Sequence, residues 1–231
     1  MRDCYVVQYD ILEYRTALEI QQQIRNKKER DRNYPNFLML LQHNNVFTIG
    51  KHGNVEHILV PEQTLRELGV DVVEIRRGGD VTYHGPGQLV AYFLLDLQTL
   101  NIGIKDFVWK MEETVIKILK RYNIQGKRIK EYPGVWVEHK GELKKIAAVG
   151  ARASKHITTH GLALNVQPNM EFFDMIIACG IKDYLPVSMK EILKTTISME
   201  TVYEQFILDY AQVFDINIKK ISSEEFIEMI K

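Results

Sequence analysis

The chain has 231 residues, of which 45% are hydrophobic and 26% charged, which suffices for one well-buried core or for one domain with a smaller lobe. Lysine plus arginine and aspartate plus glutamate each total 30, so the net charge is zero and no global field attracts nucleic acid or an anionic membrane. The N-terminus lacks the apolar core of a signal peptide, and no apolar run approaches the roughly 20 residues that span a bilayer. We therefore expect a cytoplasmic protein of enzyme size, with neither nucleic acid nor a membrane as a partner.

Strands and helices alternate along the chain without a low-complexity linker or an internal repeat, which predicts the α/β class in its α+β form. Apolar runs predict strands at 5–9, 37–42, 70–76 and 88–97, and we expect these strands to form the central sheet. Helices are expected from Tyr14 to about Arg30 and from Phe107 to Tyr122. In the second helix the apolar residues recur at helical spacing, so one stripe of it would pack on the sheet.

The C-terminal part of the chain is predicted to be helical. The residues from Met199 to Phe214 include one apolar face, and Ser222 with Glu225 forms a capping box for a final short helix. We expect a single domain that spans the whole chain, with a larger sheet-containing part over about 1–168 and a smaller lobe over about 169–231.

A glycine-rich stretch between two predicted strands, from Arg76 to Gln88, is the first candidate for a functional segment. Glycine lets the backbone approach a ligand closely, and an arginine pair beside such a loop can hold a phosphate or a carboxylate. A hairpin with ordinary turns explains the same glycines equally well. The stretch is neither a Walker loop nor a dinucleotide fingerprint, because it lacks a Gly-Lys-Ser/Thr ending and its glycines do not open a helix.

Two further stretches, 144–152 and 158–166, combine strand-like alternation with small residues. Alternation puts Ala148 and Gly150 on one face of a strand, and Gly161 and Ala163 on one face of another. If the two strands pair, they would leave a slot for a slim, extended ligand. Lys145, at the start of the first stretch, is by residue type alone an ordinary exposed lysine.

The chain has two cysteines, too few for a disulfide framework and without the spacing of a zinc site, which fits a reducing compartment. Cys179 follows an apolar run and precedes Gly180, where regular structure ends and a thiol can face a cleft. A buried structural thiol explains the same pattern. Cys4, at the head of the first predicted strand, is assigned to structure.

Taken together, these motifs resemble those of the lipoyl(octanoyl) transferases, which move an octanoyl group from acyl carrier protein to the lysine of lipoyl domains. The resemblance covers most of the chain. The residues that carry it are, in chain order, Tyr14, Ala17 and Gln21, followed by the runs 77–88, 132–136, 145–150, 160–165 and 179–181.

The resemblance implies the roles of individual residues. Cys179 matches the nucleophile that carries the acyl thioester, and Lys145 matches the lysine that activates it and handles protons. Three segments match the walls of the substrate pocket: Arg77, Gly78, Gly79, Asp80, Val81, Thr82, Tyr83 and His84; Ala148, Val149 and Gly150; and Gly161, Leu162 and Ala163. The implied fold is that of the biotin and lipoate protein ligases, a mixed central sheet flanked by helices.

The resemblance also implies the partners and cofactors of the reaction. The acyl donor would be octanoyl on the phosphopantetheine of acyl carrier protein. The acceptors would be lipoyl domains of 2-oxoacid dehydrogenase complexes and the H protein of the glycine cleavage system, in the first step of endogenous lipoate synthesis. Neither ATP nor a metal would be required.

The chemistry is reasonable on physical grounds. A free thiol titrates near about pH 8.5, and an adjacent ammonium favours the thiolate, so Lys145 beside Cys179 would give a nucleophile at neutral pH. Backbone N–H groups near Gly78 and Gly79, or from Ala148 to Gly150, are candidates to stabilise the oxyanion of each tetrahedral intermediate. The contact between Lys145 and Cys179 is implied by the resemblance.

Three alternatives stay open at this point. An ATP-dependent lipoate protein ligase of the same fold would use Lys145 to hold an adenylate, but it needs no thiol such as Cys179, and its glycine loop continues to His-Asp where this chain has Gly-Pro-Gly after His84. A non-catalytic module that binds the acyl carrier or the lipoyl domain would keep the pocket and tolerate loss of the thiol. A metal hydrolase would rest on seven histidines, yet His43, His52 and His57 lack metal-ligand spacing.

Overall fold

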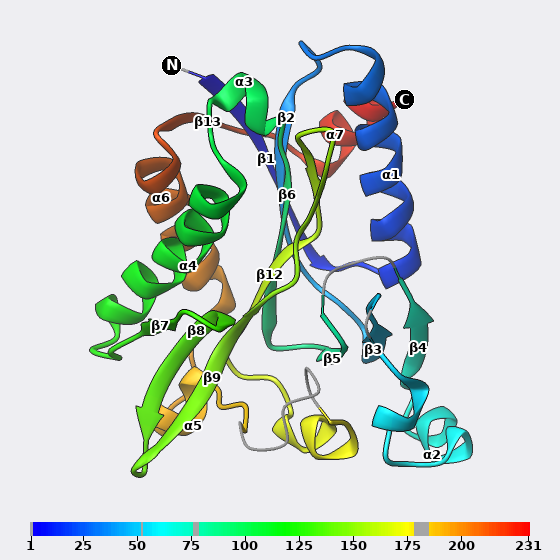
Figure 1. Cartoon of the computed structure of the whole chain (residues 1–231), viewed down its shortest axis with the longest axis vertical. Coiled ribbons are helices and arrows are strands. Elements are labelled where there is room, and N and C mark those ends of the chain that lie inside the picture. Colours follow the sequence, from blue (N-terminus) through cyan, green and yellow to red (C-terminus); the bar gives the residue numbers. More distant parts are fainter. Residues whose placement is uncertain (1, 52, 76–78, 178–184) are drawn as a thin grey trace.

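A computed structural model describes residues 2–51, 53–75, 79–177 and 185–231 of the chain. Its centre is an eight-stranded sheet (Figure 1). The strand order is β13 (Ile216–Lys220), β1 (Arg2–Ile11), β2 (Asn36–Gln42), β6 (Gln88–Leu94), β12 (Gly161–Asn165), β9 (Glu142–Val149), β8 (Tyr132–His139) and β7 (Lys127–Ile129). β1 runs parallel to both of its neighbours and the remaining pairs are antiparallel, so the sheet is mixed, as the resemblance implies.

Two helices cover each face of this sheet. α4 (Ile104–Arg121) and α6 (Met199–Phe214) lie on one face, while α1 (Tyr14–Arg30) and α7 (Ser223–Ile230) lie on the other (Figure 1). α1 has the predicted bounds, and α7 begins at the predicted capping box, in which Ser222 and Glu225 each bond to the backbone of the other. The sheet and helices therefore form three layers with a core on either side of the sheet.

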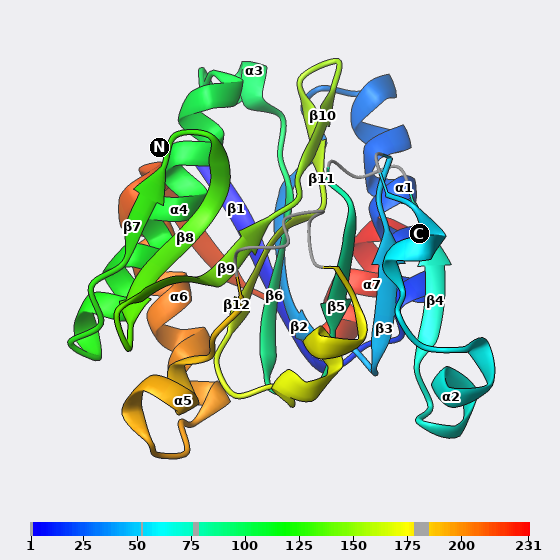
Figure 2. The same cartoon turned by 60° about the horizontal axis from the view of Figure 1, so that its bottom comes forward.

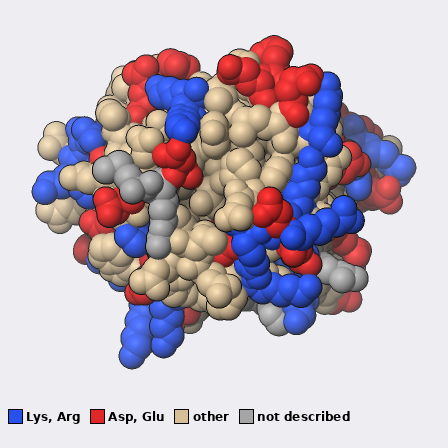
Figure 3. Space-filling view, turned by 90° about the horizontal axis from the view of Figure 1, so that it is seen from above, with Lys and Arg blue, Asp and Glu red and all other residues tan. Residues whose placement is uncertain are grey.

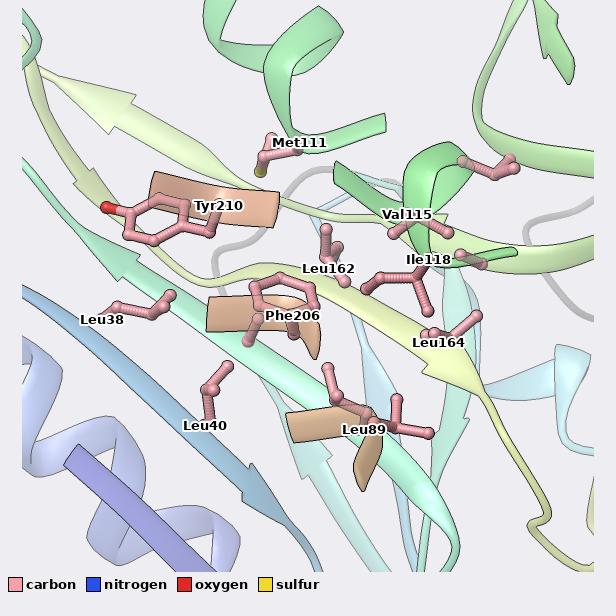
Figure 4. Packing of buried hydrophobic residues seen from close by; sticks show 14 of the residues in the cluster. Leu38, Leu40, Leu89, Met111, Val115, Ile118, Leu162, Leu164, Phe206 and Tyr210 are labelled. Atoms are coloured by element: carbon pink, nitrogen blue, oxygen red, sulfur yellow. The ribbon is translucent and has the colours of Figure 1, made fainter. Parts of the chain in front are cut away.

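Along the buried strands, successive side chains point to opposite faces of the sheet, so each strand contributes apolar residues to both cores. In β2, Leu38 and Leu40 pack toward α4 and α6, whereas Phe37 and Met39 pack toward α1 and α7. Figure 4 shows Leu38 and Leu40 on the same side as Phe206 of α6. Each such side chain is buried completely, which stabilises the fold by about 1.5–3 kcal/mol before the loss of chain entropy is counted.

A second, smaller sheet lies beside the first (Figure 2). It has the order β4 (Asp71–Glu74), β3 (Val46–Ile49) and β5 (Val81–His84). The prediction that the strand at 70–76 belongs to the central sheet is therefore wrong. The apolar pattern marks that segment as a strand, but its partner is β3, which it meets in parallel register from Val46–Asp71 to Ile49–Glu74.

The shorter elements connect these layers. They are the helices α2 (Glu62–Glu67), α3 (Leu97–Leu100) and α5 (Met189–Leu193), the 3₁₀ turns Val55–His57 and Met170–Met175, and the hairpin of β10 (Arg152–Ser154) with β11 (Ile157–Thr159). The C-terminal residues expected in a smaller lobe include α6, which packs on α4, and β13, which pairs with β1. Across the described ranges, no helix is long and apolar enough to cross a membrane. On the face shown in Figure 3, charges of both signs surround a central uncharged area.

Candidate functional site

A narrow cavity lies where the two sheets and the start of α1 meet. It is lined by Tyr14, Gly79, Thr82, His84, Ala148, Val149, Gly150, His160, Gly161, Leu162 and Ala163. These residues come from α1, β5, β9 and β12 and from loop residues next to those strands, so the three segments that the sequence analysis singled out converge on one space. The free volume is only ≈ 60 Å³, so a slender group fits it better than a bulky one.

The small residues of the cavity wall follow from strand pairing. β9 and β12 pair in antiparallel register, with Ala148 opposite Ala163 and Val149 opposite Leu162. This confirms the pairing on which the predicted slot depended. At Gly161 an added Cβ would lie 2.1 Å from the carbonyl oxygen of Ala91, so only glycine lets β12 approach β6 this closely.

Alternation divides the residues of β5 between two environments. Thr82 and His84 line the cavity, whereas Val81 and Tyr83 point the other way into an apolar cluster. Tyr83 stacks there on Phe172, with ring centroids 4.9 Å apart. The predicted pocket segment therefore includes two residues that support the wall from behind, Val81 and Tyr83.

Asp80 lies between the cavity segment and the chain that leads to Cys179. One of its carboxylate oxygens accepts a hydrogen bond from the N–H of Val81 at 2.8 Å, and the other lies 2.7 Å from Nδ1 of His57. The carbonyl oxygen of His57 in turn accepts the N–H of Ile177 at 2.8 Å. Asp80 therefore holds a turn that supports the segment immediately before Cys179. Arg77, Gly78 and Cys179 themselves lie outside the described residues.

Histidine and tyrosine rings form the wall behind the cavity. His43 is fully buried, with Nδ1 2.6 Å from the carbonyl oxygen of Leu12 and Nε2 2.7 Å from the hydroxyl of Tyr92. Because a carbonyl oxygen only accepts, Nδ1 is the protonated nitrogen and Nε2 accepts from Tyr92. Burial lowers the pKa of His43 to about 4, so this ring is neutral at pH 7.

The ring of His43 connects this wall to the cavity itself. Its centroid lies 4.9 Å from that of Tyr14 and 5.8 Å from that of His84. His84 also hydrogen-bonds the side chain of Gln88 at 2.7 Å. Within the described ranges, no group of three or more His, Cys, Asp or Glu side chains could hold a metal ion. The role of His43 and Tyr92 in the wall was missed from sequence, because neither lies in a recognisable motif.

A β-bulge places Lys145 on the cavity face of the sheet. Val135 pairs with Ala147 but the next residue, Trp136, pairs with Lys145, so β9 has one extra residue at Ile146. As a result Ile146 and Ala147 both enter the core beneath α4 and α6. Strict alternation would put Lys145 on the same face as Ala147, but the bulge moves it to the face of Ala148.

The side chain of Lys145 lies over an aromatic ring. Its Nζ is 4.6 Å from the ring centroid of Trp136, which is completely buried and donates its Nε1–H to the carbonyl oxygen of Tyr132 at 3.0 Å. A cation within about 6 Å of an indole face is attracted by the ring quadrupole. The ammonium group is therefore held at a defined place beside the cavity.

The backbone of Lys145 pairs with the chain that follows Cys179. The N–H of Lys145 donates to the carbonyl oxygen of Leu185 at 3.1 Å, and its carbonyl oxygen accepts the N–H of Val187 at 3.0 Å. At the other end, Ile177 is bonded to His57. The residues on either side of 178–184 are therefore both anchored. Ile177 is bonded to the turn beside Asp80, and Leu185 and Val187 are bonded to the strand that contains Lys145.

Comparison with known proteins places this arrangement in a family. Residues 13–211 match the model of the lipoyl protein ligase A/B catalytic domain. The octanoyltransferase of Caldicellulosiruptor saccharolyticus is 42% identical over 99% of this chain and 94% of its own length. That of Cytophaga hutchinsonii is 39% identical over 90% of this chain and 91% of its own length.

Solved structures with the same fold are ligases of low sequence identity. A lipoate-protein ligase A bound with ATP matches with a TM-score of 0.72 at 15% identity, covering 100% of this chain and 93% of its own. A bi-partite lipoate protein ligase of Thermoplasma acidophilum, studied with its E2 lipoyl domain, matches at 0.70 and 13%, covering 100% and 91%. The biotin protein ligase of Aquifex aeolicus matches at 0.51 and 14%, covering 93% and 70%. These likenesses confirm the predicted fold. The sequence matches show that the chain belongs to the octanoyltransferases of the lipoyl protein ligase A/B catalytic domain family, which are acyltransferase enzymes.

Proposed function

We propose that this acyltransferase moves an octanoyl group from acyl carrier protein to a lysine of a lipoyl domain, through a thioester on Cys179. The observation that carries the proposal is the pairing of Lys145 with Leu185 and Val187. This pairing ties the proposed proton-handling lysine to the chain that contains the proposed nucleophile. The cavity walls of small residues, beside Lys145, suit an unbranched acyl chain.

In the first half of the reaction, the Cys179 thiolate attacks the carbonyl carbon of the octanoyl thioester. The bond to the phosphopantetheine sulfur breaks, and the Lys145 ammonium gives a proton to that departing sulfur. One thioester replaces another, so the step needs little free energy. No ATP is consumed, and we propose that neither a metal nor another cofactor takes part.

In the second half, the incoming lysine amine must be uncharged to attack the thioester on Cys179. Lys145, now neutral, accepts a proton from that amine as the amide bond forms and the Cys179 sulfur departs as thiolate. This returns Lys145 to the ammonium form and the enzyme to its starting state. Because an amide is more stable than a thioester, the second half drives the whole transfer forward.

Each half passes through an oxyanion, for which backbone N–H groups are the candidate donors. The N–H of Gly150 bonds to the carbonyl oxygen of Gly161 at 2.8 Å, so it is engaged in the sheet and is removed from that set. Gly79, which lines the cavity two residues before β5, remains a candidate.

The acceptor is proposed from the family and from its neighbours. The Thermoplasma acidophilum ligase of the same fold was studied together with an E2 lipoyl domain. We therefore propose lipoyl domains of 2-oxoacid dehydrogenase complexes, and the H protein of glycine cleavage, as acceptors here. The cytoplasm is the proposed compartment, because these partners and a reduced thiol occur there.

Transfer assays with two acyl donors, each supplied separately, distinguish this proposal from an ATP-dependent ligase. The enzyme is incubated with a lipoyl domain and either octanoyl-acyl carrier protein alone, or free octanoate with ATP and magnesium. The proposal predicts octanoylated lipoyl domain from the first mixture and none from the second. If octanoylated lipoyl domain formed only in the mixture with free octanoate, ATP and magnesium, the chain would instead catalyse the ligase reaction.

A further inference from the structure

The hairpin of β8 and β9 has a recess that accommodates the stem of Lys145. Gly134 of β8 has φ 130°, and a Cβ added there would lie 2.5 Å from the carbonyl oxygen of Ala147 and 3.5 Å from Cε of Lys145. A side chain at this position would therefore collide with the bulged strand. Because residue 134 is glycine, β8 approaches the bulge and leaves space beside Cε of Lys145.

Buried polar groups fix this part of β8. The N–H of Gly134 donates to Oε1 of Glu112 on α4 at 2.8 Å, and Oε2 of the same carboxylate lies 3.2 Å from Nε of Arg128. Glu112 is only 6% exposed, and burial is the main cause that raises its pKa. The backbone that bounds the recess is thus held by a buried, hydrogen-bonded carboxylate.

Trp136 closes the recess at the ammonium end. It is 0% exposed, and its Nε1–H is engaged by Tyr132, so the plane of the ring is fixed before any substrate arrives. Because Trp136 and Lys145 are opposite one another in register, the ring and the lysine stem lie on the same face of the hairpin. An indole face attracts an ammonium and has no such attraction for a neutral amine.

We propose that Trp136 is a positioning residue for acyl transfer, whose ring face holds the Lys145 ammonium in the recess that Gly134 leaves open. The inference rests on the proposed function, which gives Lys145 two different tasks. As an ammonium it favours the Cys179 thiolate and gives a proton to the departing thiol, whereas as a neutral amine it accepts a proton from the acceptor lysine. The ring interacts favourably with the first form only, so its loss affects formation of the acyl-enzyme more than transfer from it.

The kinetic test separates the two half-reactions in the Trp136→Leu and Trp136→Phe variants. Single-turnover acylation is followed by intact-protein mass spectrometry, and transfer to a lipoyl domain is measured from pre-formed acyl-enzyme. We expect Trp136→Leu to slow acylation about 3- to 30-fold, with a smaller effect on transfer and an unchanged KM for the acyl carrier. Trp136→Phe, which keeps a ring face, should restore most of the rate.

A merely structural role for Trp136 predicts a different pattern. Both half-reactions would then slow in parallel with the loss of thermal stability, and Trp136→Phe would rescue activity only as far as it rescued stability. Either result would overturn the proposal.

A spectroscopic test detects the contact without any substrate. The chain has two tryptophans, so Trp109→Phe leaves Trp136 as the single indole. In that background we compare the emission of Lys145→Met with that of Lys144→Met. Lys144 is the matched control, because it is opposite Val137 in register, on the other face of the hairpin, and is paired with Glu142 at 3.1 Å.

The emission of Trp136 should change in Lys145→Met and stay unchanged in Lys144→Met. Identical spectra for the two variants would overturn the proposal, since the ammonium would then not lie over the ring. A change in emission together with a wild-type enzyme that forms no octanoyl adduct would refute octanoyl transfer, and with it the role of Trp136 in that reaction, while the contact itself would stand.

Discussion

The N–H of Lys145 donates a hydrogen bond to the carbonyl oxygen of Leu185 at 3.1 Å, just beyond the seven-residue segment that contains Cys179. This bond connects two motifs with 33 residues between Lys145 and Cys179 in the chain, and it extends the pairing of β9 beyond the residues that pair with β12. The lysine that we propose as proton carrier and the thiol that we propose as nucleophile are thereby linked through backbone.

Lys145 and Cys179 belong to separate motifs of the sequence, and the pairing of residues 185–187 with β9 is what relates them in the fold. Replacement of Lys145 by alanine should slow octanoyl transfer about 10²- to 10⁴-fold, the range typical of a lost general acid and base. Lys144→Ala is the matched control and should keep nearly wild-type activity, because the bulge puts its side chain on the other face of β9. Steady-state transfer to a lipoyl domain measures both variants, and equal losses in the two would contradict the assignment of Lys145.

The two cysteines should differ sharply in reactivity. Cys4 is 1% exposed on β1, with Sγ 3.4 Å from the hydroxyl of Tyr210, and burial raises the pKa of its thiol to about 12. Its thiolate is therefore scarce at pH 8, and an alkylating reagent has no access to it. Brief treatment of the folded enzyme with iodoacetamide, followed by peptide mapping, should label Cys179 and leave Cys4 unmodified. Rapid labelling of Cys4 under native conditions would show that this part of the core is open.

His43 should make the stability of the fold depend on pH. Burial lowers the pKa of His43 to about 4 in the folded state, below the value of about 6.5 for an unfolded histidine. The unfolded chain therefore binds more protons between these values, so His43 contributes stability that is fully present above about pH 6.5 and is lost as the pH falls through about 4. The size of this contribution is of the order of 3 kcal/mol.

Urea unfolding of wild type and His43→Gln, at pH 7 and at pH 4.5, measures this contribution. Glutamine cannot titrate, so the variant should lose less unfolding free energy between the two pH values than wild type does. The other titrating groups are common to both proteins and cancel in the comparison. Equal losses in the two proteins would mean that His43 is not a neutral, buried group.

Two glycines of one hairpin should differ in what their substitution does. Gly134→Ala places a methyl group 2.5 Å from the carbonyl oxygen of Ala147, so the bulged strand must shift, and we expect a loss of about 1–3 kcal/mol of stability together with slower acylation. Gly141, at the turn between β8 and β9, has φ 78° and no neighbouring atom within 4 Å of an added Cβ. Gly141→Ala should therefore lower stability through backbone strain alone and leave acylation unchanged. Equal acylation rates in the two variants would argue against the recess.

Much of the fold was predictable because its signals are local. The periodicity from Tyr14 to Arg30 gives the observed bounds of α1, and the stripe predicted from Phe107 to Tyr122 corresponds to α4, which begins slightly earlier, at Ile104. The strand at 70–76 was also correctly identified as a strand, but its partner was not. Which strands pair depends on contacts between distant segments, and the alternation within one strand does not encode them.

The candidate site shows the same division between local and distant signals. The cavity segments at 148–150 and 161–163 were identified from their small residues, and the structure brings them together. The bulge at Ile146 could not be predicted, because it exists only in the register of β9 against β8. Without it, alternation puts Lys145 on the core face, and only the family resemblance indicated otherwise. His43 was likewise missed, since its partners Leu12 and Tyr92 lie far from it in the chain.

The central claim, an octanoyl thioester on Cys179, is tested most directly by intact-protein mass spectrometry. Wild type and Cys179→Ala are each mixed with octanoyl-loaded acyl carrier protein, without ATP, and a lipoyl domain is added afterwards. We predict one octanoyl adduct on wild type, none on Cys179→Ala, and loss of the adduct as the lipoyl domain gains the octanoyl group. An adduct on Cys179→Ala, or transfer to the lipoyl domain without Cys179, would contradict the account.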